Sequence, residues 1–332
     1  MLALWTDSLQ IPKDNENIFN DIALSTFNYQ YRNNQIYREF VALSKYSPED
    51  IVHYSQIPFL PISFFKTHPL LTDAVPDVNA LLRFESSGTT GTNTSKHYVL
   101  DPHIYEESFL RTFKLFYGDP EQYVFYCLLP SYLEREHSSL VYMCRRLIRE
   151  SAHPDSGFFL NDQQRLADLL RRKEGTGRKI FLLGVTFGLL DFAEKYHDLN
   201  LGDAIVMETG GMKGRGEEWT RAQIHDFLQD TWNLSQIHSE YGMTELLSQA
   251  YAESSGIYRT PPWMKILVRD INDPKDTTTH GSGLINVIDL ANIYSCSFIA
   301  TDDIGKVNID GSFGVLGRND HSILRGCSML AV

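Results

Sequence analysis

The feature that most constrains this fold is an alternation of short apolar runs and helical patterns through the middle of the chain. Runs typical of buried strands occur at Tyr123–Leu129, Lys179–Val185 and Ala204–Met207. Helical patterns separate or precede them, at residues 105–116, 138–149, 163–172 and 217–232. We expect the last of these helices to carry Glu217 and Glu218 in its first turn. Because strands that alternate with helices are typical of βα units, the pattern predicts a largely parallel α/β sheet.

The two ends of the chain have a different pattern. Aromatic and aliphatic residues recur among polar ones at residues 17–44, which predicts helices. After Trp263, short strand candidates are separated by turns rich in Asp and Gly. We therefore predict one domain over residues 1–332, with a mainly helical region at 1–80, an α/β core at 81–262, and a smaller β-rich subdomain and tail at 263–332.

Charge and hydropathy exclude several classes of protein. Thirty basic against forty-two acidic side chains give a net charge of −12, which argues against nucleic acid as a partner. The apolar start at Met1–Trp5 lacks the basic residues of a signal peptide. No apolar run is long enough to span a bilayer, so we expect no membrane insertion and a location in the cytoplasm. The four cysteines are widely spaced and predict neither a zinc site nor a disulfide framework.

A loop of hydroxyl residues and glycines follows the short strand candidate at residues 81–85. It contains Ser86, Ser87, Gly88, Thr89, Thr90 and Gly91. Glycines let backbone N–H groups turn towards an anion and hydroxyls add donors, so this composition suits a phosphate cradle, with Lys96 as a nearby cation. It is not a Walker A loop, because the Gly-Lys-Ser/Thr ending is absent. The alternative is a flexible serine/threonine turn.

A second element lies at Ser239–Glu245. Its tyrosine can lie against a base, its threonine can donate to a phosphate oxygen, and its glutamate can hold Mg²⁺ beside phosphate oxygens. The residues are Tyr241, Gly242, Met243, Thr244 and Glu245. The alternative is a strand that runs into a helix and carries a solvated glutamate.

A third element combines Thr301–Gly305 with Gly317–Asp320. The carboxylate of Asp303 can accept hydrogen bonds from both hydroxyls of a ribose, and Arg318 can reach ribose or phosphate. By itself, each segment also has the composition of an ordinary β-turn.

In this order the three elements resemble the signatures of the adenylate-forming superfamily, which comprises acyl-CoA synthetases, luciferases and peptide-synthetase adenylation domains. The family signatures look like SSGTTG, YGMTE and TGDIG followed by GR, and the resemblance extends from Ser86 to Asp320. It implies an α/β large domain with intertwined subdomains and ATP and Mg²⁺ as cofactors.

The resemblance also implies roles for single residues. It implies that residues 86–91 grip pyrophosphate, that Thr244 meets the α-phosphate and that Glu245 binds Mg²⁺. It implies that Tyr241 packs on adenine, next to Gly242 and Met243. The other implied positions are Asp303 and Arg318 at the ribose, Gly210 and Gly211 in the loop that lines the adenine pocket, and His137 on the acyl side. A surface position remains the alternative for His137.

The sequence departs from the family pattern in two ways, and the second of these points to one subfamily. The proline and lysine usual soon after the glycine loop are missing, and Lys96 is displaced. The chain also ends shortly after Arg318, which implies that the mobile C-terminal lid domain is absent. A shortened body that ends in Arg325-Gly326-Cys327-Ser328 resembles the LuxE-type acyl-protein synthetases. That resemblance implies transfer of the activated acyl group, here a fatty acid, to Cys327, with acyl reductase and acyltransferase subunits as partners.

Cys327 is also the cysteine whose surroundings best suit a nucleophile. It stands two residues after Arg325, and a nearby cation favours the thiolate. The other three cysteines lie in apolar or amphipathic runs and are expected in the core. Alternatives to the acyl-carrier role are an inert thiol, a phenylacetate-CoA ligase-like enzyme that uses coenzyme A, and a nucleotide-binding subunit without catalysis.

Overall fold

The fold of the chain is given by a computed structural model. It describes residues 2–12, 15–73, 77–86, 94–129, 136–159, 161–172, 177–210 and 219–319. The chain divides into two compact units. The first unit comprises Met1–Leu81, His97–Leu100 and Pro262–Val332, and the second comprises Leu82–Lys96 and Asp101–Pro261. The N-terminal and C-terminal ranges therefore fold together, and the middle of the chain forms a body of its own.

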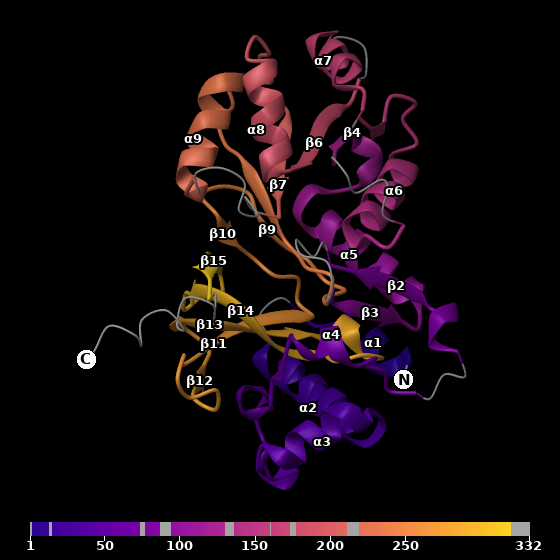
Figure 1. The fold of residues 1–332 in the computed structure, drawn as a ribbon, viewed down its shortest axis with the longest axis vertical. Helices are drawn as coiled ribbons and strands as arrows, with labels where there is room; N and C mark the ends of the chain where they lie inside the picture. Colours follow the sequence, from indigo (N-terminus) through magenta and orange to yellow (C-terminus); the bar gives the residue numbers. More distant parts are fainter. Residues whose placement is uncertain are drawn as a thin grey trace, which may run out of the picture. The chain divides into compact units, whose positions relative to one another are not determined.

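The second unit is built around a largely parallel sheet with strand order β5-β4-β6-β7-β8-β9. Its first four pairings are parallel, and β9 runs antiparallel to β8. The strands are β4 (Tyr123–Leu128), β5 (Gly157–Phe158), β6 (Lys179–Val185), β7 (Ile205–Thr209), β8 (His238–Tyr241) and β9 (Ala250–Ala252). The helices are α5 (Pro102–Tyr117), α6 (Ser139–Ser151), α7 (Gln163–Arg172), α8 (Thr186–Lys195) and α9 (Arg221–Trp232). The parallel α/β sheet predicted from the sequence is confirmed (Figure 1).

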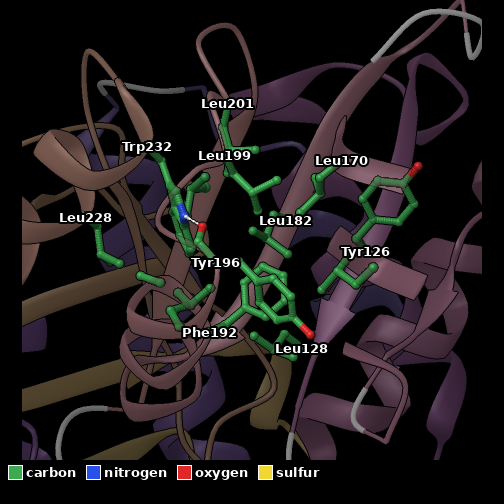
Figure 2. Packing of buried hydrophobic residues seen from close by; sticks show 14 of the residues in the cluster. Tyr126, Leu128, Leu170, Leu182, Phe192, Tyr196, Leu199, Leu201, Leu228 and Trp232 are labelled. Carbon is green, nitrogen blue, oxygen red and sulfur yellow. Dashed lines mark hydrogen bonds between the residues drawn. The ribbon is translucent and has the colours of Figure 1, made fainter. Parts of the chain in front are cut away.

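One face of this sheet is covered by α7, α8 and α9. Tyr126, Leu128 and Leu182 point from the strands into a cluster that the helices complete, and Figure 2 shows this packing. Trp232, the last residue of α9, is fully buried there. Its indole Nε1 donates a hydrogen bond of 3.2 Å to the carbonyl oxygen of Tyr196, drawn dashed in Figure 2. The bond satisfies a buried donor that would otherwise destabilise the apolar cluster.

The opposite face of the same sheet packs on α5. The ring of Phe113 lies 5.5 Å from that of Phe125 and 5.4 Å from that of Phe181, between centroids. Successive strand residues point to opposite faces, so strands covered on both faces, such as β4 and β6, are apolar at nearly every position. This is why the sequence shows continuous apolar runs here, without the alternation of a half-exposed strand.

The first unit combines helices from the start of the chain with an antiparallel sheet from its end. The sheet order is β15-β14-β13-β11-β12, and β1 adds in parallel to β14. The strands are β1 (Leu60–Pro61), β11 (Met264–Arg269), β12 (Thr277–Thr278), β13 (Gly281–Asp289), β14 (Phe298–Val307) and β15 (Phe313–Arg318). The helices are α1 (Leu2–Ser8), α2 (Glu16–Asn33), α3 (Gln35–Leu43) and α4 (Phe64–Thr67). Three more short strands are described: β3 (Lys96–Val99) lies mainly in this first unit, and β2 (Leu82–Glu85) and β10 (Ile257–Tyr258) lie in the second unit.

A buried glutamine joins the two distant parts of the first unit. Gln30 of α2 donates from Nε2 to the carbonyl oxygens of Asn292 and Ile293, at 2.9 and 3.0 Å. Its Oε1 accepts from the backbone N–H of Ser297 at 3.0 Å. Phe27 of the same helix packs edge-on against Phe298. The N-terminal helices therefore complete the core of the C-terminal sheet.

Three sequence expectations differ from the structure. Helix α9 begins at Arg221 and not at Glu217, because Thr220 caps it, so the predicted acidic first turn is wrong. The Thr301–Gly305 segment is not a turn but part of the long strand β14, which pairs on both sides. Helix α8 was not anticipated, because apolar residues follow β6 without a polar break.

Candidate functional site

Polar side chains gather where the central parallel strands of the second unit end. Thr186 follows β6, Glu208 and Thr209 close β7, and Glu240 and Tyr241 close β8. The strands pair in register so that these residues share one edge of the sheet. In open α/β sheets, ligands bind outside the carboxyl ends of the strands. This edge is therefore the candidate site of the second unit.

A buried carboxylate, Glu208, lies at the centre of this edge and is only 4% exposed. Its Oε2 accepts a hydrogen bond of 2.8 Å from the hydroxyl of Thr186. Its Oε1 lies 3.3 Å from Nε of Arg221 and 3.7 Å from Nε2 of His225. The same His225 nitrogen lies 3.3 Å from the hydroxyl of Ser239. Four elements of the unit thus meet at one carboxylate.

The start of α9 explains how two of these partners reach Glu208. Thr220 and Gln223 form a reciprocal capping box, with bonds of 3.3 and 2.8 Å. The helix then places Arg221 and His225, four residues apart, on the same side. Burial alone raises the pKa of Glu208, but the nearby His225 ring and the charge of Arg221 outweigh it and hold that pKa below its usual value. Glu208 is therefore ionised at neutral pH.

A second buried carboxylate, Glu240, lies on the opposite face of the sheet. Its Oε2 accepts a short hydrogen bond from the hydroxyl of Thr209. Burial raises the pKa of Glu240 to about 7; the Thr209 hydrogen bond opposes this shift and the charge of Glu208 adds to it. Its neighbours Tyr105 and Tyr251 are fully buried phenols with a raised pKa. At neutral pH, Glu208 at the end of β7 is therefore ionised, whereas Glu240 at the end of β8 is close to its pKa.

We expect Glu240 to give the protein a stability that falls as the pH rises from about 4.5 to about 7. The folded state binds this proton more tightly than the unfolded chain, so the free energy of unfolding decreases across that window. The contribution of Glu208 has the opposite sign and falls below pH 4.5. The free energy of unfolding can be measured by urea unfolding at about pH 5 and about pH 7.5. Its decrease between the two pH values should be smaller in a Glu240→Gln variant than in the wild type. An equal loss in both proteins would contradict the assignment.

The predicted adenine-binding residue begins a tightly packed segment. The ring of Tyr241 is buried and lies 5.9 Å from that of Tyr258. The guanidinium of Arg221 lies 5.3 Å from the centre of the Tyr258 ring. Gly242 follows, and a methyl group on its Cα would stand 2.2 Å from Oε1 of Glu240. Glycine is therefore required because the backbone passes directly over the buried carboxyl group.

The rest of the segment turns back into the sheet. The N–H of Leu246 donates to the carbonyl oxygen of Met243 at 3.1 Å, and the chain returns as β9. Thr244 is half-buried, and Glu245 is 5% exposed. The alternative interpretation of a helix with a solvated glutamate is therefore wrong.

The hydroxyl-glycine loop is closed at its base. The N–H of Ser86 donates to the carbonyl oxygen of Ser95 at 3.1 Å, and the N–H of Ser95 donates to Oγ of Ser86 at 2.9 Å. Lys96 follows and is exposed. Five predicted phosphate-binding residues, Ser87, Gly88, Thr89, Thr90 and Gly91, lie outside the described residues. Two hydrogen bonds between Ser86 and Ser95 thus hold the two ends of the loop together.

His137 lies beside the strand that leads into this loop. Its carbonyl oxygen accepts from the N–H of Glu85 at 2.9 Å, and its Nε2 lies 3.4 Å from Nη2 of Arg83. The ring is half-buried. Gly210 follows β7 with a φ of +82°, a conformation that favours glycine. Gly211 lies outside the described residues.

The cysteines divide in the way expected from the sequence, as far as the structure describes them. Cys127, Cys144 and Cys296 are all buried in apolar surroundings. Burial raises the pKa of Cys296 to about 12, and the pKa of Cys144 is also raised, by a hydrogen bond with Cys127 and by burial. Cys327 lies outside the described residues.

The predicted ribose-binding pair belongs to the first unit. Asp303 of β14 stands opposite Arg318 of β15 in the antiparallel register. The Arg318 guanidinium is well exposed, and its Nη2 lies 4.0 Å from Oδ2 of Asp302. The N–H of Asn319 donates to the carbonyl oxygen of Asp302 at 2.8 Å. One hairpin thus brings the two predicted residues together.

Two residues at the strand ends were not predicted from the sequence. Neither Glu208 nor Glu240 was given a role by the sequence analysis. The signal available was a single acidic residue at the end of an otherwise apolar run, as in Ile205–Thr209. A buried charge of this kind is uncommon and needs partners.

The described residues contain neither a candidate metal cluster nor a candidate membrane-spanning helix. No group of three or more His, Cys, Asp or Glu side chains in that part of the chain is arranged to hold a metal ion. Among the helices it contains, none is long and apolar enough to cross a membrane.

This chain is similar in sequence to a known family of enzymes and to one curated ligase. The model of a family described as acyl-protein synthetase, LuxE, matches residues 2–113. The long-chain-fatty-acid–luciferin-component ligase of Vibrio harveyi is 26% identical over 297 residues, which are 85% of this chain and 77% of that protein. Both the family and the relative are ligases by description, which confirms the predicted class of enzyme.

The fold is shared with solved adenylate-forming enzymes. ATP-bound MatB from Rhodopseudomonas palustris superposes with a TM-score of 0.52 at 17% identity over 74% of this chain, which spans 50% of MatB. A 2-hydroxyisobutyryl-CoA ligase in complex with its acyl-AMP gives a TM-score of 0.61 at 12% identity, covering 90% of this chain and 67% of that one. Identities this low establish the fold alone. The chain therefore has the fold of the adenylate-forming enzymes and is related in sequence to the LuxE acyl-protein synthetases.

Proposed function

We propose that this protein uses ATP to activate a carboxylic acid as its acyl-adenylate, with release of pyrophosphate. The observation that carries the proposal is the position of Tyr241–Glu245 in the adenylate-forming fold, at the carboxyl edge of the parallel sheet. The closed base of the hydroxyl-glycine loop, at Ser86 and Ser95, belongs to the same unit. Both features suit a nucleotide with its phosphates.

The first chemical step joins two anions, because a carboxylate oxygen attacks the α-phosphorus. The work of the protein is therefore positioning and neutralisation of charge. Loop amides at residues 86–91 would hold the pyrophosphate, Lys96 would add a positive charge, and the Thr244 hydroxyl would donate to the α-phosphate. Mg²⁺ would be held by Glu245, a single buried carboxylate, which suits an ion that takes one or two carboxylates beside phosphate oxygens. The ion would neutralise phosphate charge.

The remaining predicted residues would orient the nucleoside and the acid. Tyr241 and Gly210 would line the adenine pocket, and Asp303 with Arg318 would hold the ribose. Asp303 stands opposite Arg318 in the strand register, and its carboxylate can accept hydrogen bonds from both ribose hydroxyls. His137, beside the entry to the phosphate loop, would stand on the acyl side.

We further propose that the acyl group passes to Cys327. The thiolate sulfur attacks the acyl carbonyl carbon, a C–S bond forms, the C–O bond to phosphate breaks, and AMP leaves with the electron pair. The three described cysteines are buried, and burial disfavours the thiolate that this step needs. The name of the Vibrio harveyi relative points to a long-chain fatty acid as substrate. An acyl reductase would be the recipient of the thioester, with an acyltransferase as the source of the acid.

The adenylation step is tested by exchange of labelled pyrophosphate into ATP in the presence of Mg²⁺ and candidate acids. A long-chain fatty acid should support exchange more strongly than aryl or amino acids. If no acid supports exchange, the proposal of an adenylating enzyme fails, and a nucleotide-binding subunit without catalysis remains.

The acceptor is tested by incubation with ATP and labelled fatty acid without coenzyme A. We expect label on the peptide that contains Cys327, and its loss in a Cys327→Ser variant with exchange activity retained. Cys144→Ala serves as the control, because that thiol is buried in the core. This variant should still be labelled on the Cys327 peptide. Product that forms only when coenzyme A is added, with unlabelled protein, would reject the carrier role in favour of a coenzyme A ligase.

A further inference from the structure

Strand β14, which carries the predicted ribose-binding residue Asp303, is unpaired with β13 over three residues. In the pairing of β13 with β14, Leu284 faces Ile304 and Asn286 faces Ala300. One residue of β13, Ile285, is thus opposite the three residues Thr301–Asp303 of β14. Such bulges interrupt the hydrogen-bond ladder and change the direction of side chains, and they are frequent beside active sites. Here the bulge contains Asp302 and Asp303.

A bulge leaves backbone carbonyl groups without their partners in the ladder, and burying them unpaired would destabilise the fold. Arg269, at the end of β11, occupies this gap. Its Nη1 donates to the carbonyl oxygen of Ile285 at 3.0 Å and to Oδ1 of Asn286 at 2.6 Å. Its Nη2 donates to the carbonyl oxygen of Thr301 at 2.6 Å. One guanidinium therefore supplies donors to a backbone carbonyl group of each strand at the bulge.

The threonine at the start of the bulge adds two more bonds. Its hydroxyl donates to the carbonyl oxygen of Ile285 at 2.8 Å and accepts from the N–H of Asp303 at 3.2 Å. The backbone of Asp303 is thus one hydrogen bond from Thr301, whose carbonyl group Arg269 holds. Arg269 is part-buried, and its charge interacts with that of Asp302. Arg269 of β11 is thus linked to Asp303 by hydrogen bonds through Thr301 and to Asp302 by charge.

We propose that Arg269 is a positioning residue for the nucleotide ribose, because it holds the Thr301–Asp303 bulge in the conformation that presents the Asp303 carboxylate. This inference rests on the proposed function, in which Asp303 binds the ribose hydroxyls. An arginine is required, because its planar fork reaches two carbonyl oxygens and an amide oxygen at once. A lysine ammonium keeps the charge but cannot span the same acceptors.

The test compares ATP with 2′,3′-dideoxy-ATP in wild-type protein and in an Arg269→Lys variant. Wild-type protein should bind ATP more tightly than the dideoxy analogue in titration calorimetry. The variant should bind ATP about tenfold more weakly and the analogue almost as well as wild type does, because one or two charge-assisted bonds are lost. In pyrophosphate exchange, the KM for ATP should rise, with the KM for the acid unchanged.

The matched control is Arg178→Lys. Arg178 also donates to a backbone carbonyl group, that of Ser151, but belongs to the second unit. It should leave the preference for ATP over the analogue unchanged. If Arg269→Lys does not fold, Thr301→Val removes the hydroxyl that ties Asp303 and should cause the same selective loss.

The outcomes separate the two proposals. Equal weakening of ATP and of the analogue in the variant, with exchange activity intact in wild-type protein, would overturn the role of Arg269 alone. Equal binding of both nucleotides by the wild type would also overturn it, since Asp303 would then not read the ribose. Absence of acid-dependent exchange in wild-type protein that still prefers ATP in calorimetry would overturn the proposed function and leave the positioning role standing.

Discussion

A Gly242→Ala variant is expected to lose acid-dependent pyrophosphate exchange by about a hundredfold or more, since displacing a site by about 1 Å can cost this much. The added methyl group would stand 2.2 Å from Oε1 of Glu240, well inside van der Waals contact. Glu240 cannot move away easily, because it is buried and accepts a hydrogen bond from the hydroxyl of Thr209. The backbone of the Tyr241–Glu245 segment must therefore shift, and with it the predicted nucleotide contacts.

Two comparisons show whether this contact is the cause. At Gly157 an added methyl group would meet only the ring of Phe159, at 3.8 Å, so Gly157→Ala should retain exchange activity. In a Glu240→Ala background the obstructing carboxyl group is gone, and Gly242→Ala should then cause a much smaller loss. Additive losses in this double-mutant cycle would mean that the two groups do not interact.

A Glu208→Gln variant is expected to lower the free energy of unfolding by about 3 kcal/mol, towards the lower end of the range for breaking a buried ion pair. The carboxylate is 4% exposed and is surrounded by Thr186, Arg221 and His225. The lower end applies because the Arg221 side chain is 31% exposed and keeps part of its hydration. The neutral amide must also present an N–H group where only donors now point.

The control for this variant is an ion pair on the surface. Glu107 pairs with Arg111 at 2.8 Å, but both side chains are exposed, at 40% and 50%. Glu107→Gln should change the free energy of unfolding by no more than about 0.5 kcal/mol. Urea unfolding at neutral pH measures both variants, and a similar small effect for the two would show that Glu208 does not anchor the strand ends.

Much of the fold could be predicted from local patterns. The strands at Tyr123–Leu128 and Lys179–Val185 were visible as apolar runs because both faces of the sheet are covered, and covered faces require apolar residues at every position. Helix α5 was visible because Tyr105, Phe109 and Phe113 recur on one face. The start of α9 was misplaced, because two acidic residues before Thr220 looked as favourable as the cap that the helix uses.

The site could be predicted only in part. Composition suggested Ser86–Gly91 and Tyr241–Glu245 and the family resemblance gave them roles, and those roles stay predictions. The two buried carboxylates at the strand ends, Glu208 and Glu240, became evident only from the tertiary structure. The pairing of β7 with β8 places Glu208 and Glu240 at one edge on opposite faces, and the partners of each come from segments far away in the chain.

The sequence by itself determined the parallel α/β core, the order of the three predicted nucleotide-binding elements and the class of protein they resemble, because these depend on short-range patterns of residues. The tertiary structure alone decided that the first 81 residues and the last 71 form one unit. It alone showed that Thr301–Asp303 is a bulge held by Arg269 and that two glutamates are buried. Each depends on pairing between residues distant in the chain, and side-chain periodicity within one segment carries no information about its partner.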